Sequence, residues 1–160
     1  TSVAVIIALL DTTWFSDVQV FGTRPDLVLI VLVYHAHRRG VQRGQLTGFG
    51  IGLIEDILSA APFGFFALVR MSVSAVLGLT NGSIRGDTVL TPMVLVLSGF
   101  VIRFFMTLVL TTLFGMAAVT GRLLSVTTLV ELLLTVVFAP LVFFLLQRAL
   151  RRFEHRGGLS

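Results

Sequence analysis

The fold is decided by long apolar runs such as LVLIVLVY at residues 27–34 and VLVLSGFVI at residues 94–102. A lipid-facing barrel needs apolar and polar residues to alternate along each strand, and these runs do not alternate. Helices satisfy their own backbone hydrogen bonds, as a lipid environment requires. The runs therefore predict an all-α, polytopic membrane protein.

The composition of the whole chain agrees with this prediction. The 160 residues are 56% apolar and only 12% charged, and the mean hydropathy is +1.00. A soluble domain carries about 25% charged residues, so a water-soluble globule is excluded. No basic stretch is interleaved with stacking aromatic residues outside the apolar segments, and we expect no nucleic-acid partner.

Six segments are candidate membrane spans, since a helix needs about 20 residues to cross the hydrocarbon layer. They cover about residues 2–15, 26–36, 46–60, 63–80, 92–115 and 126–147. Pro140 lies inside the last segment and predicts a kink there. The connections are short, so we expect one six-helix transmembrane domain, residues 1–147, followed by a basic cytoplasmic tail, residues 148–160.

The arginines predict the orientation, because basic loops stay on the cytoplasmic side. With six spans, Arg24 and Arg122 fall on one side of the membrane. The opposite side then holds the arginines of two connections and of the tail, namely Arg38, Arg39, Arg43, Arg85, Arg148, Arg151, Arg152 and Arg156. Both termini are therefore expected in the cytoplasm. The arginines expected to contact anionic lipid head groups are Arg38, Arg39, Arg43, Arg148, Arg151 and Arg152.

Ionisable side chains within the spans are the candidate functional residues, because each costs about 2.5–3.5 kcal/mol to insert. They are Asp11, Glu55, Asp56, Arg70, Arg103 and Glu131. At a rise of about 1.5 Å per residue, most of them lie in the outer half of the bundle. We expect a polar pocket or a partner-docking surface that opens outward. The alternative is internal neutralisation that only fixes the register of the helices.

Helical spacing predicts which of these residues meet. A stripe of residues four apart, Gly44, Gly48, Gly52 and Asp56, lets a neighbouring helix approach closely. The tight turn at 61–64 makes the third and fourth spans antiparallel, which predicts an Asp56–Arg70 ion pair. Glu55 points about 100° away from Asp56. Across the last hairpin, Glu131 is expected to pair with Arg103.

The sequence contains no pattern typical of a catalytic or metal site. It has no HExxH motif, no Gly-x-Ser-x-Gly elbow, no P-loop and no cysteine. The three histidines cannot form a compact site, since His35 and His37 point to different faces and His155 is in the tail. We therefore expect no enzymatic activity, no metal and no cofactor.

An ordered series of short motifs in the second and third spans points to a family. It consists of Arg24-Pro25-Asp26-Leu27, Arg38-Arg39-Gly40, Gly44, Gly48-Phe49, Gly52-Leu53, Asp56 and Pro62-Phe63-Gly64. This series resembles MreD, the small rod-shape-determining membrane proteins of bacteria, most strongly over residues 24–66. Glu55, directly before Asp56, departs from the family pattern.

The resemblance implies a non-enzymatic scaffold of the cell-elongation machinery, which directs lateral peptidoglycan synthesis from the bacterial inner membrane. Such proteins are taken to bind MreC, a single-span protein with a large periplasmic domain. They are also taken to work with MreB filaments and with the wall glycosyltransferase and transpeptidase. Distant similarity to the substrate-binding (S) components of energy-coupling-factor transporters implies a six-helix bundle with an outward-facing cavity. The alternative function is a substrate-binding membrane subunit of a small-solute transporter.

Overall fold

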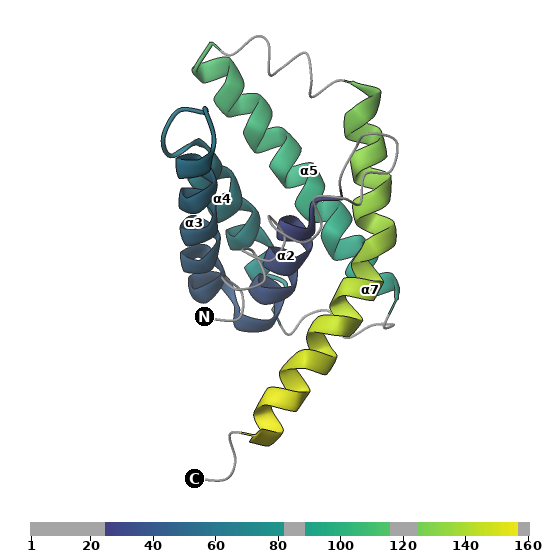
Figure 1. Cartoon of the computed structure of the whole chain (residues 1–160). Coiled ribbons are helices and arrows are strands. Elements are labelled where there is room, and N and C mark those ends of the chain that lie inside the picture. Colours follow the sequence, from purple (N-terminus) through teal and green to yellow (C-terminus); the bar gives the residue numbers. More distant parts are fainter. Residues whose placement is uncertain (1–24, 82–88, 116–124, 157–160) are drawn as a thin grey trace.

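A computed structural model describes residues 25–81, 89–115 and 125–156, with side chains as far as Arg148. These ranges form five helices and contain no strand, which confirms the all-α prediction (Figure 1). The helices are α2 (Leu27–Arg39), α3 (Val41–Leu58), α4 (Phe65–Gly78), α5 (Leu90–Leu113) and α7 (Val126–Arg156). The predicted first span at 2–15, with Asp11, lies outside the described residues.

The short helix α2 is the centre of the bundle. It contacts each of the other four described helices, which follow one another around it in the order α3, α4, α5 and α7 (Figure 1). Its residues from Leu29 to Tyr34 are all buried, as expected for a helix that is apolar all round. Among the described helices α3 and α7 do not contact each other, so the ring around α2 is open between them.

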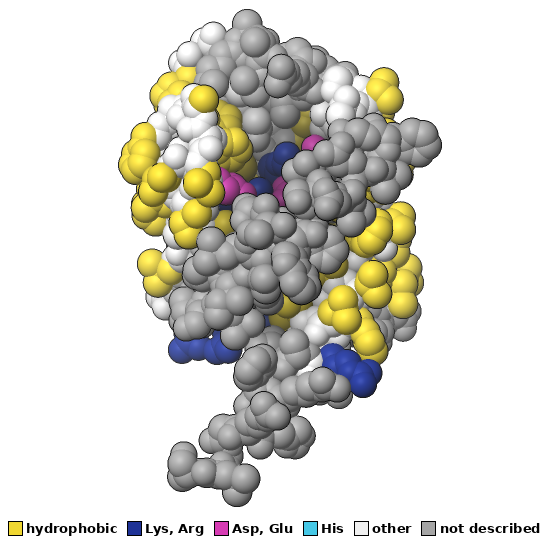
Figure 2. All heavy atoms as spheres, in the orientation of Figure 1, with side chains coloured by type: hydrophobic (Ala, Val, Ile, Leu, Met, Phe, Trp, Pro, Cys, Tyr) yellow, Lys and Arg dark blue, Asp and Glu magenta, His cyan; other side chains and the backbone are white. Residues whose placement is uncertain are grey.

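The outer faces of the long helices are apolar. Exposed side chains recur at helical spacing along α5, at Leu97, Val101 and Phe105, and along α7, at Leu133, Val137 and Leu141. Figure 2 shows such side chains along both flanks of the molecule and basic side chains at its lower end. Within the described ranges, α5 and the Val126–Arg148 part of α7 are long and apolar enough to cross a membrane, by length and composition.

Glycines bring α3 and α4 into close contact. A Cβ atom added at Gly52 would lie 2.5 Å from Ala67 Cα, and one at Gly48 would lie 2.6 Å from the Arg70 carbonyl oxygen. Gly44 faces Ala36 and Ser74 in the same way. The glycine stripe is therefore turned toward α4 and α2, where the absence of side chains permits the approach.

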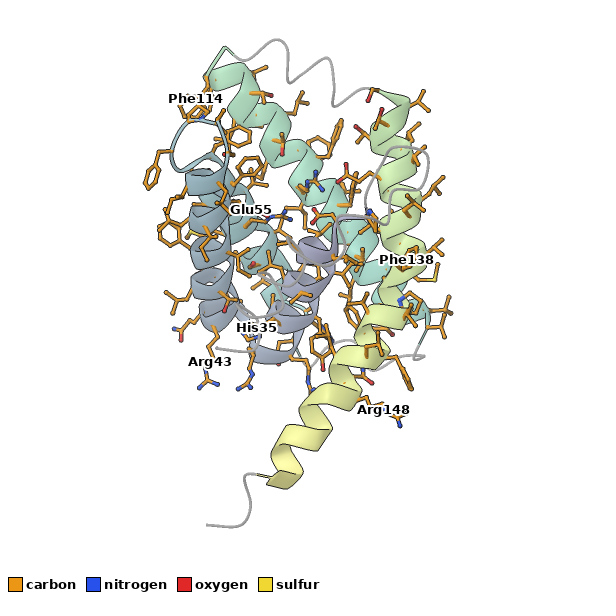
Figure 3. All side chains as sticks on the ribbon, in the orientation of Figure 1. His35, Arg43, Glu55, Phe114, Phe138 and Arg148 are labelled. Carbon is orange, nitrogen blue, oxygen red and sulfur yellow. The ribbon has the colours of Figure 1, made fainter. Side chains whose placement is uncertain are left out.

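Helix α7 continues past the expected domain boundary at residue 147 and ends at Arg156. Pro140 lies inside it, and in Figure 3 the helix changes direction close to Phe138. A proline inside a helix removes one backbone hydrogen bond, which accounts for a bend at this point. The same view places Arg43 and Arg148 at one end of the bundle and Phe114 at the other.

Candidate functional site

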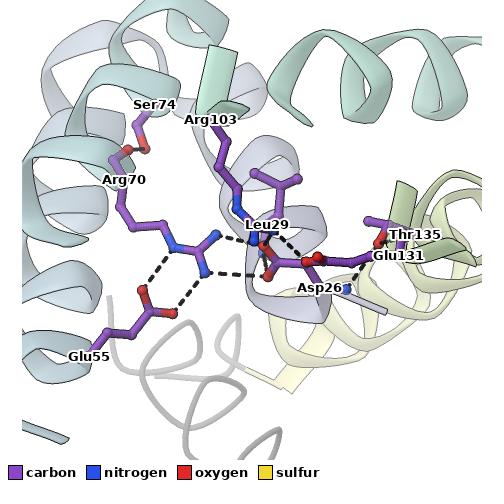
Figure 4. Close-up of polar contacts among 8 residues, drawn as sticks. All are labelled: Asp26, Leu29, Glu55, Arg70, Ser74, Arg103, Glu131 and Thr135. Carbon is purple, nitrogen blue, oxygen red and sulfur yellow. Dashed lines mark hydrogen bonds and ion pairs between the residues drawn. The ribbon is translucent and has the colours of Figure 1, made fainter. Parts of the chain in front are cut away.

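Five charged side chains meet above the N-terminal end of α2 (Figure 4). Each comes from a different helix or its cap, so the group joins all five helices of the described ranges. The members are Asp26 before α2, Glu55 on α3, Arg70 on α4, Arg103 on α5 and Glu131 on α7. We call this group the ion-pair chain.

Arg70 forms the buried half of the ion-pair chain. Its Nε and Nη2 atoms donate to Glu55 Oε2 and Oε1 at 2.9 and 2.8 Å, a bidentate arrangement. Its Nη1 atom donates to Asp26 Oδ2 at 3.0 Å, and the side chains of both residues are only 8% exposed. Charge-assisted bidentate bonds are among the strongest polar contacts in proteins, so this half fixes α3 and α4 against α2.

Arg103 completes the ion-pair chain on the other side. Its Nη1 atom donates both to Asp26 Oδ2 and to Glu131 Oε1, the latter at 2.7 Å. Its guanidinium lies over the ring of Phe100, 5.3 Å from the ring centre, where the two attract each other. The order of contacts is therefore Glu55, Arg70, Asp26, Arg103, Glu131, and the chain connects α3 to α7 although these helices do not touch.

Asp26 is the central member because α2 begins inside the bundle. Its Oδ1 atom accepts a hydrogen bond from the Leu29 backbone N–H at 2.9 Å, which caps the helix. Its own N–H donates to Thr135 Oγ1 on α7 at 3.0 Å. The positive end of the helix dipole further favours a carboxylate here. One residue thus caps a helix and forms ion pairs with two arginines.

The expected Asp56–Arg70 ion pair is wrong. Asp56 instead accepts hydrogen bonds from the backbone N–H groups of Gly64, Phe66 and Ala67, at 3.0, 2.8 and 3.1 Å. The turn after α3 places the first amides of α4 directly opposite the glycine stripe, and these amides have no partner within their own helix. Asp56 satisfies them, while Glu55, on the adjacent face of α3, takes Arg70.

The structure forms the expected ion pair between Glu131 and Arg103. It also adds Asp26, which is not among the six candidate functional residues of the sequence analysis. Two signals pointed to it. An Asp directly before an apolar run is a typical helix cap, and the predicted span at 26–36 is shorter than the about 20 residues that a crossing helix needs. So short a helix would end within the bilayer, where a charged residue needs a partner.

The ion-pair chain is partly exposed. Figure 2 shows a hollow that contains basic and acidic side chains and has apolar side chains along its left border. Arg103, Glu55 and Glu131 remain partly open, with side-chain exposures of 27, 24 and 22%. In the described ranges every buried polar side-chain atom has a hydrogen-bond partner, and no group of three residues there is suited to hold a metal.

A second, basic set of residues lies at the opposite end of α2 from the ion-pair chain. Arg38, Arg39 and Arg43 are all exposed, and Arg38 donates to the Tyr34 hydroxyl at 2.9 Å. Arg148 lies at the same end as Arg43 (Figure 3). Arg151 and Arg152 continue along α7, and their side chains lie outside the described part.

Apolar outer faces together with charged side chains that pair with one another inside the bundle are typical of helical membrane proteins. The particular family follows from the sequence: the family model described as rod shape-determining protein MreD matches residues 1–149, and the chain belongs to this family. Its members act in rod-shape determination at the membrane and are not a known enzyme family. Searches of curated proteins and of solved structures found no match.

Proposed function

We propose that this protein is a non-enzymatic scaffold of the cell-elongation machinery, embedded in the bacterial inner membrane by several spans. The observation that carries the proposal is the ion-pair chain. Its charged groups bond to one another and join five helices, which is what a rigid docking platform requires. A catalytic group, by contrast, has to be free to react with a substrate.

The proposed partners are MreC, directly, and MreB and the wall glycosyltransferase and transpeptidase, indirectly. Membership of the family supports a place in this machinery. The exposed apolar stripes of α5 and α7 support a membrane-embedded contact, because a single-span partner offers a helix of the same kind. Membrane lipids cover the remaining apolar surface.

For the arrangement in the membrane we propose a six-helix bundle like the S components of energy-coupling-factor transporters, comprising residues 1–147. The basic tail, residues 148–160, and both termini lie in the cytoplasm. The grouping of Arg43 and Arg148 at one end supports this orientation, with Arg38, Arg39, Arg151 and Arg152 near lipid head groups. Reporter fusions at both ends test it, and a periplasmic C-terminus would contradict it.

The alternative function, a substrate-binding subunit of a small-solute transporter, is favoured by one observation, the hollow that contains charged side chains. The two functions are separated by purifying the full chain after co-expression with tagged MreC. A stable complex without a bound solute supports the scaffold. A small molecule detected by native mass spectrometry in the absence of MreC supports the transporter subunit.

A further inference from the structure

The ion-pair chain carries one excess negative charge. Three carboxylates, of Asp26, Glu55 and Glu131, face the two guanidinium groups of Arg70 and Arg103. An uncompensated charge among apolar helices is costly, because little water is present to solvate it. A further cation would neutralise the group, whereas a bound anion would double the imbalance.

The excess charge belongs to the Glu131 end of the chain. Both carboxylate oxygens of Glu55 accept from Arg70, and both of Asp26 accept hydrogen bonds. Among the described residues, the Glu131 carboxylate accepts a hydrogen bond only at Oε1, from Arg103. The Nη1 atom of Arg103 that makes this bond is shared with Asp26. One nitrogen thus serves two carboxylates, and Glu131 is the less compensated of the two.

The Glu131 end is also open. The side chains of Glu131 and Arg103 are 22 and 27% exposed, against 8% for Asp26 and Arg70. They come from α7 and α5, the two described helices that are long and apolar enough to cross a membrane. An apolar segment that carries a cation matches these two helices, because it can pack on their exposed apolar faces.

We propose that Glu131 receives the ammonium or guanidinium group of a lysine or arginine in the membrane-spanning segment of a partner protein. The ion-pair chain and the partner's cation together then have three carboxylates and three cations. The apolar part of the segment packs on the exposed faces of α5 and α7. This inference rests on the proposed function, for which the partner is the single-span protein MreC.

The test uses the full chain co-expressed with tagged MreC and the variant Glu131→Gln. The amide keeps an oxygen that accepts from Arg103 but removes the excess charge. We expect recovery of the complex to fall roughly tenfold or more, because one member of a buried charged pair is lost. The melting temperature of the variant alone should stay equal or rise. Replacing the partner's lysine or arginine with Gln should give the same loss, with no further loss when both changes are combined.

A matched control is Glu55→Gln, which weakens the bidentate pair with Arg70 and should lower the melting temperature of the protein alone. Unchanged recovery with Glu131→Gln, or a partner segment without lysine or arginine, would overturn the inference while leaving the scaffold intact. No complex with the unaltered chain would overturn the proposed function itself.

Two other sources of the cation are outcomes of the same test. If n-butylammonium raises the melting temperature of the unaltered chain but not of Glu131→Gln, while recovery of the complex is the same for both chains, the site binds a free amine and the proposed source is wrong. If Arg24→Gln and Glu131→Gln have non-additive effects on the melting temperature of the isolated chain, the cation is internal, and the proposal is wrong as well.

Discussion

Arg70 and Asp26, 44 residues apart in the sequence, form a buried ion pair in which Arg70 Nη1 and Asp26 Oδ2 are 3.0 Å apart. The pair joins α4 to the cap of the central helix α2. Because Asp26 also accepts from Arg103, it connects the α3–α4 side of the bundle with the α5–α7 side. The stability of the whole bundle should therefore depend on this contact.

Replacing Arg70 with an uncharged residue tests whether the stability of the bundle depends on the Arg70–Asp26 contact. Arg70→Met leaves Glu55 and Asp26 without their shared partner, and we expect a loss of about 3–5 kcal/mol in the free energy of unfolding. Thermal unfolding in detergent measures it. The control is Arg39→Met, an exposed position whose effect should stay within about 0.5 kcal/mol. A loss no larger than the control's would show that the buried pair does not stabilise the bundle.

The two adjacent acidic residues of α3 should respond differently to substitution. Asp56→Ala removes the acceptor for three backbone N–H groups of the turn and the first turn of α4, and we expect a loss of about 1–3 kcal/mol. Hydrogen exchange should accelerate at these amides, while the Arg70 contacts persist. Asp56→Asn, which keeps one acceptor oxygen, should lose less. Equal exchange in Asp56→Ala and the unaltered chain would contradict the capping role.

The glycines of α3 offer a matched pair of variants. Gly52→Ala would place a methyl group 2.5 Å from Ala67 Cα, so α3 and α4 have to separate and the melting temperature should fall. Gly50 has nothing within 4 Å of an added Cβ atom. Gly50→Ala should therefore stabilise the helix, by up to about 1 kcal/mol through helix propensity. The same change in melting temperature for both variants would be inconsistent with the described packing.

Thr135 holds the start of α2 against α7. Thr135→Val keeps the shape of the side chain but removes the acceptor for the Asp26 N–H group, and we expect a loss of about 1–3 kcal/mol. Thr112→Val is the control, because that hydroxyl is exposed and bonds only to its own helix. Chemical denaturation of the two variants gives the comparison, and indistinguishable midpoints would argue against the Asp26–Thr135 bond.

The sequence was sufficient to predict helices, because long apolar runs without alternation allow no other structure in lipid. It also predicted the Glu131–Arg103 pair, since one hairpin and a long flexible Arg side chain bring the two together. The Asp56–Arg70 prediction failed because face periodicity shows which side a carboxylate is on but not what lies opposite. Here the first backbone N–H groups of α4 lie opposite Asp56, and its carboxylate accepts hydrogen bonds from them instead of pairing with Arg70.

The role of Asp26 could not be derived from face periodicity at all. It depends on a helix that starts within the bundle and on arginines from two other helices, so it is a property of the tertiary arrangement. The same holds for the excess charge at Glu131, which becomes visible only when the five members are placed together. Asp11 lies outside the described residues, and its predicted place near the outer end of a first span remains a prediction.

The most direct test of the ion-pair chain is a double-mutant cycle on Asp26 and Arg70, with free energies of unfolding measured for Asp26→Asn, Arg70→Gln and the double variant. If the two residues stabilise the bundle through each other, the double variant should lose less than the sum of the single losses, by about 1–3 kcal/mol. Strictly additive losses would show that the two side chains act independently and would contradict the account.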